Sequence, residues 1–498
     1  MTAPSDASPT PVAPATGEEH PILSSRVHGV APLRLVWLTA GLVLTALIAL
    51  SACSTLLPSR AQTEREAATV DSPRWQLQDT PGHEGEPLIR VRIVRGEPVV
   101  LISGSESIRV TPPRRPRIRV VGGGIDETMD AGTQILQGPI TVTLGVEAWR
   151  IADGRGHTRR LPRSTGDVID DALRITSVDG SMLEVDGARL PGTLWLHGRT
   201  TGTGGAQAGV IDVVEHLPIE MYLPGVIAKE LYPNWGLETF KAQAIAARSY
   251  ALHERQRRIA VGSHFDVEST TQDQVYGGAT TNPTALRAVE QTYGTVLTWQ
   301  GHLLRAYYSS TTGGRAASAR DTWPITRGFE YNLMPPIQAS PRDDIDSFSP
   351  LFTWTVERDI EELSTRIRTF AETRSMGLRT LQQVAKIEPV ARNEFDRPQR
   401  YRITEQGGRW WELSAEDTRL AMNHAGTSGL AAPTRDQRIN SGDFTTRREG
   451  NKLIFEGRGF GHGVGMSQFG AEGMARRGIP AEEILMHYYP GAQLTKWY

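Results

Sequence analysis

The strongest constraint on the fold is an alternation of apolar and charged residues that begins at Ile89. Residues Ile89–Ile93 run Ile-Arg-Val-Arg-Ile, and a second alternating run follows at Ile140–Val146. This period of two puts one set of side chains on each face of a strand, as a half-buried sheet requires. Further short apolar runs lie between Gly and Asp turns, at Leu173–Val178, Leu183–Val185 and Leu194–Leu196. We therefore predict a β-rich region over residues 87–200.

The pattern changes after residue 209, where helical segments enter. A predicted strand, Val210–Val214, precedes the segment Met221–Leu231 and a helix over Leu237–His253, whose many alanines allow close packing. Other predicted elements are helices at Pro283–Gln291 and Asp359–Phe370 and strands at Thr295–Trp299 and Lys452–Phe455. A chain of 498 residues is too long for one compact core. We predict an α+β fold, with a domain of mixed sheet and helices over residues 201–498 after the β-rich region.

Residues 1–53 are typical of an export and anchoring segment. Leu35–Cys53 is a run of 19 positions without a charge, preceded by Arg26 and Arg34. The run ends in Leu-Ser-Ala-Cys, which resembles the lipobox of a lipoprotein lipidated on Cys53. An uncleaved transmembrane helix is the alternative, because about 20 apolar residues span a bilayer. Both interpretations predict a membrane-anchored, extracytoplasmic protein of the cell envelope, with residues 54–86 as a flexible linker.

One carboxylate has surroundings that suit acid catalysis. The largely apolar segment Tyr222–Ala228 precedes Lys229 and Glu230, and Tyr, Pro and Trp follow before the next helix. Such surroundings desolvate a carboxyl group and raise its pKa, as a general acid needs near neutral pH. The alternative is a structural ion pair of Glu230 with Lys229, Lys241 or Arg248. On composition alone, the ion pair is the simpler interpretation.

A glycine-rich segment near the C-terminus is the second candidate site. Five glycines occupy alternate positions from Gly457 to Gly465. On an extended segment they remove the side chains from one face, so that a ligand or another chain can lie against the backbone. His462, Ser467 and Gln468 add hydrogen-bonding groups beside that face. The alternative is a hinge or a tightly packed pair of strands. A G-x-G-x-x-G dinucleotide fingerprint does not fit the spacing.

These segments and several others resemble, in order, the SpoIID/LytB family of sporulation and cell-wall proteins. The resemblance covers about 290 residues, from roughly 209 to 498. It rests on Tyr222–Glu230 with Trp235, Lys241–Tyr250, Asp273–Gly278, Ala306–Ser310 with Gly313 and Gly314, Gly457–Gly470, Glu483–Leu485 and His487–Gly491.

The resemblance implies a peptidoglycan lytic transglycosylase. Such an enzyme cuts the β-1,4 bond between N-acetylmuramic acid (MurNAc) and N-acetylglucosamine (GlcNAc) and leaves a 1,6-anhydro ring on the muramic acid. In the family one glutamate, at the position of Glu230, acts as acid and then as base. Because the muramic 6-hydroxyl is the nucleophile, the second carboxylate of ordinary glycosidases is not needed. The residues expected to line the glycan groove, each with a scaffold role as its alternative, are Gln243, Arg248, Tyr276, Ser310, His462, Ser467 and Gln468.

The resemblance also implies peptidoglycan glycan strands as the partner, in sporulation or in general wall remodelling. A non-catalytic, glycan-binding enhancer of a cell-wall amidase is the alternative function, and a purely structural envelope lipoprotein is a third. Some family members bind zinc through two cysteines, but here Glu268 and Asp273 stand at those positions and favour backbone amides or solvent. The net charge of −2 gives no case for nucleic acid. We predict no metal and no cofactor.

Overall fold

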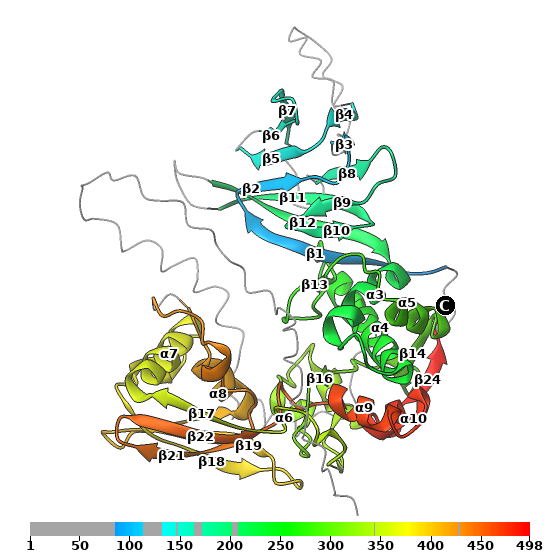
Figure 1. Ribbon diagram of the computed structural model, residues 1–498. Coiled ribbons are helices and arrows are strands. Elements are labelled where there is room, and N and C mark those ends of the chain that lie inside the picture. The colour runs from blue at the N-terminus through cyan, green and yellow to red at the C-terminus, as the bar shows by residue number, and fades with distance from the viewer. Residues whose placement is uncertain are drawn as a thin grey trace, which may run out of the picture. The chain divides into compact units, whose positions relative to one another are not determined.

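The computed structural model describes residues 85–112, 132–145, 148–163, 172–201, 208–342, 344–426 and 429–498. The predicted anchor with Cys53, and all but the last two residues of the predicted linker, lie outside these ranges. Among the described residues, no helix combines the length and the apolar character needed to cross a membrane. The described part mixes helices and sheets, so the chain has an α+β fold (Figure 1).

The β-rich part is built on a seven-stranded sheet with the order β13-β1-β12-β11-β8-β3-β4. Its strands are β1 (Leu88–Glu97), β3 (Ser107–Thr111), β4 (Gln134–Gln137), β8 (Leu173–Ser177), β11 (Thr193–Thr201), β12 (Ala208–Pro218) and β13 (Val267–Glu268). A four-stranded sheet joins β2 (Val99–Ile102), β5 (Ile140–Leu144), β6 (Ala148–Ala152) and β7 (Thr158–Pro162), and β9 (Leu183–Val185) pairs with β10 (Ala188–Leu190). The alternating run in β1 buries Ile89 and Val91 completely, as its period of two predicts.

The seven-stranded sheet also crosses the predicted boundary between residues 200 and 201. β13 pairs in parallel with β1 and brings Glu268 beside Arg92. The Arg92 guanidinium contacts the Glu268 and Asp212 carboxylates, which explains why this arginine is buried although the alternation predicts an exposed position. One hydrophobic core therefore includes Ile89 and Val91 of β1 and residues of the helices that follow. The boundary between the two domains stays a prediction.

Helices α3 (Ile219–Glu230), α4 (Leu237–Ala260) and α5 (Pro283–Gln291) follow the sheet. The alanines of α4 from Ala242 to Ala251 are buried and let it pack against α3, α5, α9 (Gln468–Ala475) and α10 (Ala481–Tyr488), as Figure 1 shows. Strands β14 (Thr295–Trp299), β15 (His302–Leu303) and β24 (Gln493–Lys496) form one small sheet. Strand β16 (Tyr308–Ser309) pairs in parallel with β23 (Met466–Ser467), and the short helix α6 (Ala319–Thr322) follows β16.

A further group of elements has a hydrophobic core of its own. Its strands are β17 (Thr353–Asp359), β18 (Val384–Arg392), β19 (Pro398–Glu405), β20 (Trp410–Ser414), β21 (Phe444–Glu449) and β22 (Lys452–Arg458), and its helices are α7 (Ile360–Thr373) and α8 (Ala415–Met422). It lies in the chain between β16 and β23, which are hydrogen-bonded neighbours. This group is therefore an insertion between two strands that meet near Glu230.

Candidate active site

Glu230 is the last residue of α3 and is half-buried. The helix ends there because Leu231 adopts an extended conformation, and Pro233 follows two residues later. The backbone N–H of Val275 donates to Glu230 Oε1 at 3.3 Å, and the amide Nε2 of Gln468 donates to Oε2 at 3.2 Å. Burial raises the pKa of Glu230 above its ordinary value, and these two donors offset part of that rise because they favour the carboxylate. The group thus combines a raised pKa with partial access to solvent.

The expected alternative for Glu230, a structural ion pair, is absent from the described residues. Lys241 pairs with Glu238 at 3.0 Å, and Arg248 pairs with Glu220 at 2.7 Å. The carbon stem of Lys229 covers Gly277 so closely that a side chain at Gly277 would overlap it. Lys241 and Arg248 are therefore engaged elsewhere, and no ion pair joins Lys229 to Glu230 in the described part of the chain.

Gln468 is held in place by the packing of α9 against the start of α4. The Glu472 carboxylate accepts hydrogen bonds from the Gly236 N–H at 2.9 Å and the Thr239 hydroxyl at 2.8 Å. The ring of Phe469 packs edge-on against Trp235, with centroids 4.9 Å apart. These contacts join α9 to the loop directly after Glu230, and Gln468 at the first turn of α9 is itself buried. The amide that meets Glu230 is therefore positioned before any ligand binds.

A hydrogen-bonded chain of neutral groups lies beside the carboxyl. Tyr222 donates its hydroxyl to Gln274 Oε1 at 3.1 Å, and Gln274 Nε2 donates to the Tyr308 hydroxyl at 3.0 Å. Burial, and after it the nearby Glu230 charge, raises the pKa of Tyr308. Tyr222, Gln274 and Tyr308 lie inside the family motifs, but the sequence predicted no role for them. Their position as polar residues within otherwise apolar or aromatic stretches is the feature that could have indicated one.

Two of the residues predicted to line the groove lie in the same neighbourhood. The parallel bridge between β16 and β23 pairs Ser309 with Ser467, and the carbonyl of half-buried Ser310 accepts from the Phe469 N–H at 3.0 Å. Ser310 therefore lies next to the turn of α9 that carries Gln468. Ser467 is buried, accepts from the Gly470 N–H at 3.1 Å and donates to Asp346 at 3.0 Å. Its hydroxyl is the N-cap of α9.

The other predicted lining residues have buried surroundings. Arg248 is fully buried and ties Glu220 of α3 to the carbonyl of Thr295. Gln243 is fully buried in α4, and its amide has no hydrogen-bond partner within the described ranges. Tyr276 packs on the ring of Tyr222, with centroids 5.0 Å apart, and its hydroxyl faces the buried carboxyl of Glu215. Whether these three bind glycan stays a prediction.

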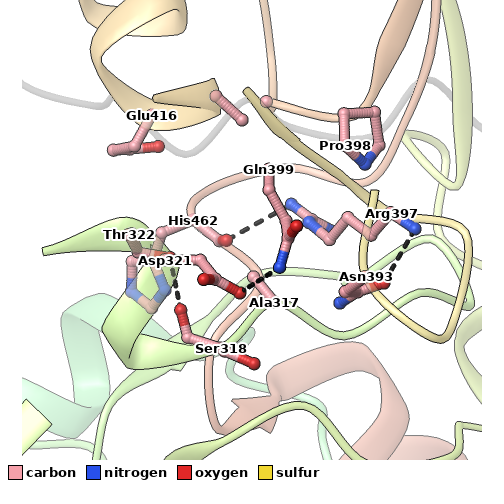
Figure 2. A pocket seen from close by; sticks show the side chains of 12 residues that line it. Ala317, Ser318, Asp321, Thr322, Asn393, Arg397, Pro398, Gln399, Glu416 and His462 are labelled. Carbon is pink, nitrogen blue, oxygen red and sulfur yellow. Dashed lines mark hydrogen bonds between the residues drawn. The ribbon is translucent and has the colours of Figure 1, made fainter. Parts of the chain in front are cut away.

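His462 lies in a separate pocket, between the loop that carries α6 and the insertion (Figure 2). Its ring packs against Trp323, with centroids 4.9 Å apart, and its Nδ1 accepts from the Val464 N–H at 3.0 Å. Arg397 of the insertion donates to the His462 carbonyl at 3.2 Å and to the Arg315 carbonyl at 2.7 Å. Burial lowers the pKa of His462 to about 4, so its ring is neutral near pH 7. The contacts described for His462 do not include Glu230.

The glycine-rich segment differs from the extended face that the sequence predicts. Four of its alternating glycines have positive φ, from +71° at Gly465 to +98° at Gly461. A side chain at Gly465 would also lie 2.0 Å from the Tyr307 carbonyl. Glycine is therefore required here by backbone conformation and by close packing within the protein. The segment binds the chain's own loops along its first half and reaches the Glu230 region only at Gln468.

The residues at the family's zinc positions do not fit a zinc site. Glu268 pairs with Arg92, which differs from the expected backbone or solvent contact. Asp273 accepts the Glu268 N–H at 2.9 Å, as expected, and the Tyr250 hydroxyl at 3.1 Å. Over the described ranges, no three His, Cys, Asp or Glu side chains group as a metal site. Both carboxylates already have partners, and neither is a thiolate.

Comparisons with known proteins agree with the resemblance read from the motifs. Residues 207–299 match the model of SpoIID, the stage II sporulation protein family, and residues 337–465, which contain most of the insertion, match a domain of unknown function, DUF8618. The chain is 29% identical over 296 residues to the amidase enhancer of Bacillus subtilis (strain 168), covering 55% of this chain but 40% of that protein. It therefore spans less than half the length of that relative.

The second comparison protein is the stage II sporulation protein D of the same organism. It is 28% identical over 301 residues, which cover 57% of this chain and 76% of that protein. An uncharacterized protein of Brachyspira hyodysenteriae is 28% identical over 290 residues, which cover 57% of this chain and 68% of its own length. Together with the ordered motifs around Glu230, the SpoIID match and these likenesses support a SpoIID/LytB family protein.

Proposed function

We propose that this protein is a peptidoglycan lytic transglycosylase in which Glu230 is the only acid–base group. The observation that carries the proposal is the environment of that carboxyl. It has a pKa raised by burial, partial access to solvent and two neutral donors, the Val275 N–H and the Gln468 amide. A protonated carboxyl of this kind can donate a proton, and the same donors then stabilise the carboxylate that remains.

In the proposed reaction, protonated Glu230 donates its proton to the oxygen that links C1 of MurNAc to GlcNAc. The C1–O bond breaks and the GlcNAc hydroxyl leaves. The Glu230 carboxylate then accepts the proton of the muramic 6-hydroxyl while that oxygen bonds to C1 and closes the 1,6-anhydro ring. Glu230 is protonated again at the end, and no water is consumed. One carboxyl group therefore suffices, in contrast to the carboxylate pair of hydrolytic glycosidases.

The engagement of neighbouring carboxylates supports a mechanism with one acid. Glu238 pairs with Lys241 and accepts the Ala481 N–H at 2.8 Å. Asp266 is buried, pairs with Arg90 at 2.6 Å and accepts the Arg90 N–H at 2.9 Å. Among the described residues, no other carboxylate has a contact with Glu230. A hydrolytic mechanism would need one of these groups to activate water.

The test is product analysis after the full chain is incubated with purified, peptide-free glycan strands. We expect fragments that end in 1,6-anhydro-MurNAc and are one water lighter than fragments with a reducing end. Reducing-end products would mean that water is the nucleophile and would contradict the mechanism. The absence of any cleavage would contradict the enzyme itself.

A specific observation also favours a second function, because one relative is named an amidase enhancer. In that case the Glu230 region would bind glycan strands without cutting them, and the protein would raise the activity of a partner amidase. Measuring how strongly the Glu230→Gln variant stimulates an amidase distinguishes the two functions. Full stimulation by the variant, with no cleavage by the parent protein, would favour the enhancer.

We further propose that Cys53 carries the lipid that anchors the protein outside the cytoplasmic membrane. The proposal rests on the apolar run and the Leu-Ser-Ala-Cys ending of residues 35–53. Mass spectrometry of the envelope-purified protein should find lipidated Cys53 as the mature N-terminus. An unmodified peptide that spans Ala52–Ser54, recovered from most of the protein, would contradict the anchor and favour the transmembrane alternative.

A further inference from the structure

A second polar groove lies on the seven-stranded sheet, among residues other than those that surround Glu230. It has a volume of about 510 Å³ and is lined from β1, β8, β11, β12 and the turns beside them. This volume is within the range of ligand pockets, roughly 300–1,000 Å³. Thr193 and Trp195, which line it from β11, alternate with buried Leu194 and Leu196 and so lie on the opposite face of the strand from these two core side chains.

Two stacked aromatic rings line the groove. The rings of Trp195 and His216 have centroids 5.3 Å apart and an interplanar angle of 25°. The strand register brings them together, since Thr193 pairs with His216 and Trp195 stands two residues further along β11. Both side chains are half-buried. They offer a flat apolar surface that solvent, or a ligand, can reach.

Hydrogen-bonding groups surround the two rings. Arg174 lies directly opposite Trp195 in the pairing of β8 with β11 and is exposed, with no ion pair in the described part of the chain. The hydroxyls of Thr176 and Thr193 line the same groove. The Nε2 atom of His216 is buried without a hydrogen-bond partner in the described structure. Burial lowers the pKa of His216 to about 3, so near pH 7 the ring is neutral.

We propose that this groove is a second carbohydrate site, which holds a peptidoglycan glycan strand apart from the Glu230 region. A pyranose ring has an apolar C–H face that packs on an aromatic ring, and hydroxyls at its edge that need hydrogen-bond partners. The Trp195–His216 stack supplies the aromatic surface for the C–H face. Arg174 and the threonine hydroxyls supply hydrogen-bond partners for the sugar hydroxyls. The inference rests on the proposed function for the identity of the glycan. Two contacts on one polymer would raise the overall affinity for long strands.

The test is cosedimentation of the full chain with insoluble, peptide-free glycan strands. Every protein carries Glu230→Gln, so that the strands stay intact. Trp195→Ala should weaken binding about tenfold, because it removes the larger stacking surface. Arg174→Ala should weaken it about threefold, and this exposed position lets the fold remain intact. The matched control is Trp410→Ala, which removes an exposed tryptophan of the insertion. It should bind like the Glu230→Gln parent.

The outcomes distinguish this inference from the proposed enzyme activity. If Trp195→Ala and Arg174→Ala both bind glycan like Trp410→Ala, the carbohydrate site is overturned, whatever the product analysis of the parent protein gives. If they bind glycan normally but no longer stimulate an amidase, the groove is a protein-binding surface and the inference is again overturned. Lost glycan binding by both variants supports the groove even if the parent protein cuts no glycan. Circular dichroism and Tm must match the parent protein for either variant to count.

Discussion

Two glutamates in the SpoIID-matched stretch, Glu215 and Glu230, share a raised pKa but differ in their access to ligands. Glu215 lies on the core face of β12, is fully buried and accepts the Gly192 N–H at 2.7 Å. Burial raises the pKa of its carboxyl to about 7. Glu230 lies at the end of α3, is half-buried and accepts from the Val275 N–H and the Gln468 amide. Burial raises its pKa as well.

A raised pKa alone does not identify a catalytic acid. Desolvation raises the pKa of both carboxyls, but of the two only Glu230 keeps partial access to solvent. Glu230 also has a side-chain amide in position to stabilise the carboxylate that would form during the reaction. Access to solvent, together with a side-chain amide donor, therefore separates the candidate acid from the structural one.

The largest effect is expected from Glu230→Gln, because glutamine keeps the shape of the side chain but has no proton to transfer. Turnover of peptide-free glycan should fall about 10²–10⁴-fold, the usual contribution of a positioned acid–base group. Glycan binding and circular dichroism should stay close to those of the parent protein. Glu215→Gln is the matched control, and its turnover should stay within a factor of about three. Equal losses of turnover in the two variants would contradict the assignment of Glu230, and not Glu215, as the catalytic acid.

Glu215→Gln should instead change how stability depends on pH. As pH rises from 4.5 to about 7, the unfolded chain releases the Glu215 proton while the folded protein keeps it, so the parent protein loses stability over this window. At about 1.36 kcal/mol per pH unit, the loss is on the order of 3 kcal/mol by pH 8. Glutamine has no such loss and still accepts the Gly192 N–H. Denaturant unfolding at pH 5 and pH 8 should give a flatter profile for the variant, and parallel profiles would contradict the assignment.

A smaller effect is expected from Gln468→Met, which removes one donor from Glu230 and keeps much of the volume. The Gln468 amide favours the carboxylate and so lowers its pKa. Its loss should raise the pKa of Glu230, and the fall of kcat/KM at high pH should move up by about one pH unit. Ser467→Ala is the control, since that hydroxyl caps α9 and contacts Asp346. It should lower Tm and leave the pH profile in place.

Local parts of the fold could be predicted because their signals lie close together in the sequence. Helix α5 begins and ends as predicted, at Pro283 and Gln291, because Asn282 caps a first turn that starts with proline. Strand β14 also has the predicted bounds, Thr295–Trp299. The apolar segment before Glu230 correctly indicated desolvation, since burial does raise the pKa of that carboxyl.

The rest depends on contacts between distant residues. The partner of Arg248 is Glu220, on a different helix, and nothing in the helix motif indicates it. The surroundings of His462 include Arg397, which comes from the insertion and donates to the His462 carbonyl at 3.2 Å. The positive φ angles at Gly459, Gly461, Gly463 and Gly465 could not be read from their spacing, because alternating glycines suit both an extended strand and a tight loop.

Metal removal is expected to change neither stability nor glycan turnover. This prediction tests whether the polypeptide alone positions Glu230. Asp273 stands two residues before Val275, whose N–H binds Glu230 Oε1 at 3.3 Å. A zinc ion held by Glu268 and Asp273 would therefore contribute to the position of the acid. The contacts argue against one, because Arg92 already neutralises Glu268 and Asp273 accepts two protein donors. Zinc sites that stabilise folds are also built mainly from cysteine and histidine.

We therefore expect a chelator to leave both Tm and glycan turnover unchanged, and elemental analysis of the full chain to find zinc well below one equivalent. Asp273→Asn sharpens the test, because the asparagine oxygen can keep the hydrogen bond from the Glu268 N–H, while its amide nitrogen replaces the oxygen that accepts the Tyr250 hydroxyl. If protein donors hold this segment, the variant should keep the fold, with a loss of about 1 kcal/mol in the free energy of unfolding. Stoichiometric zinc, with unfolding on chelation and loss of the metal in Asp273→Asn, would contradict this account. Glu230 would then owe its position to a metal, while the position of Glu215 would still be set by the sheet alone.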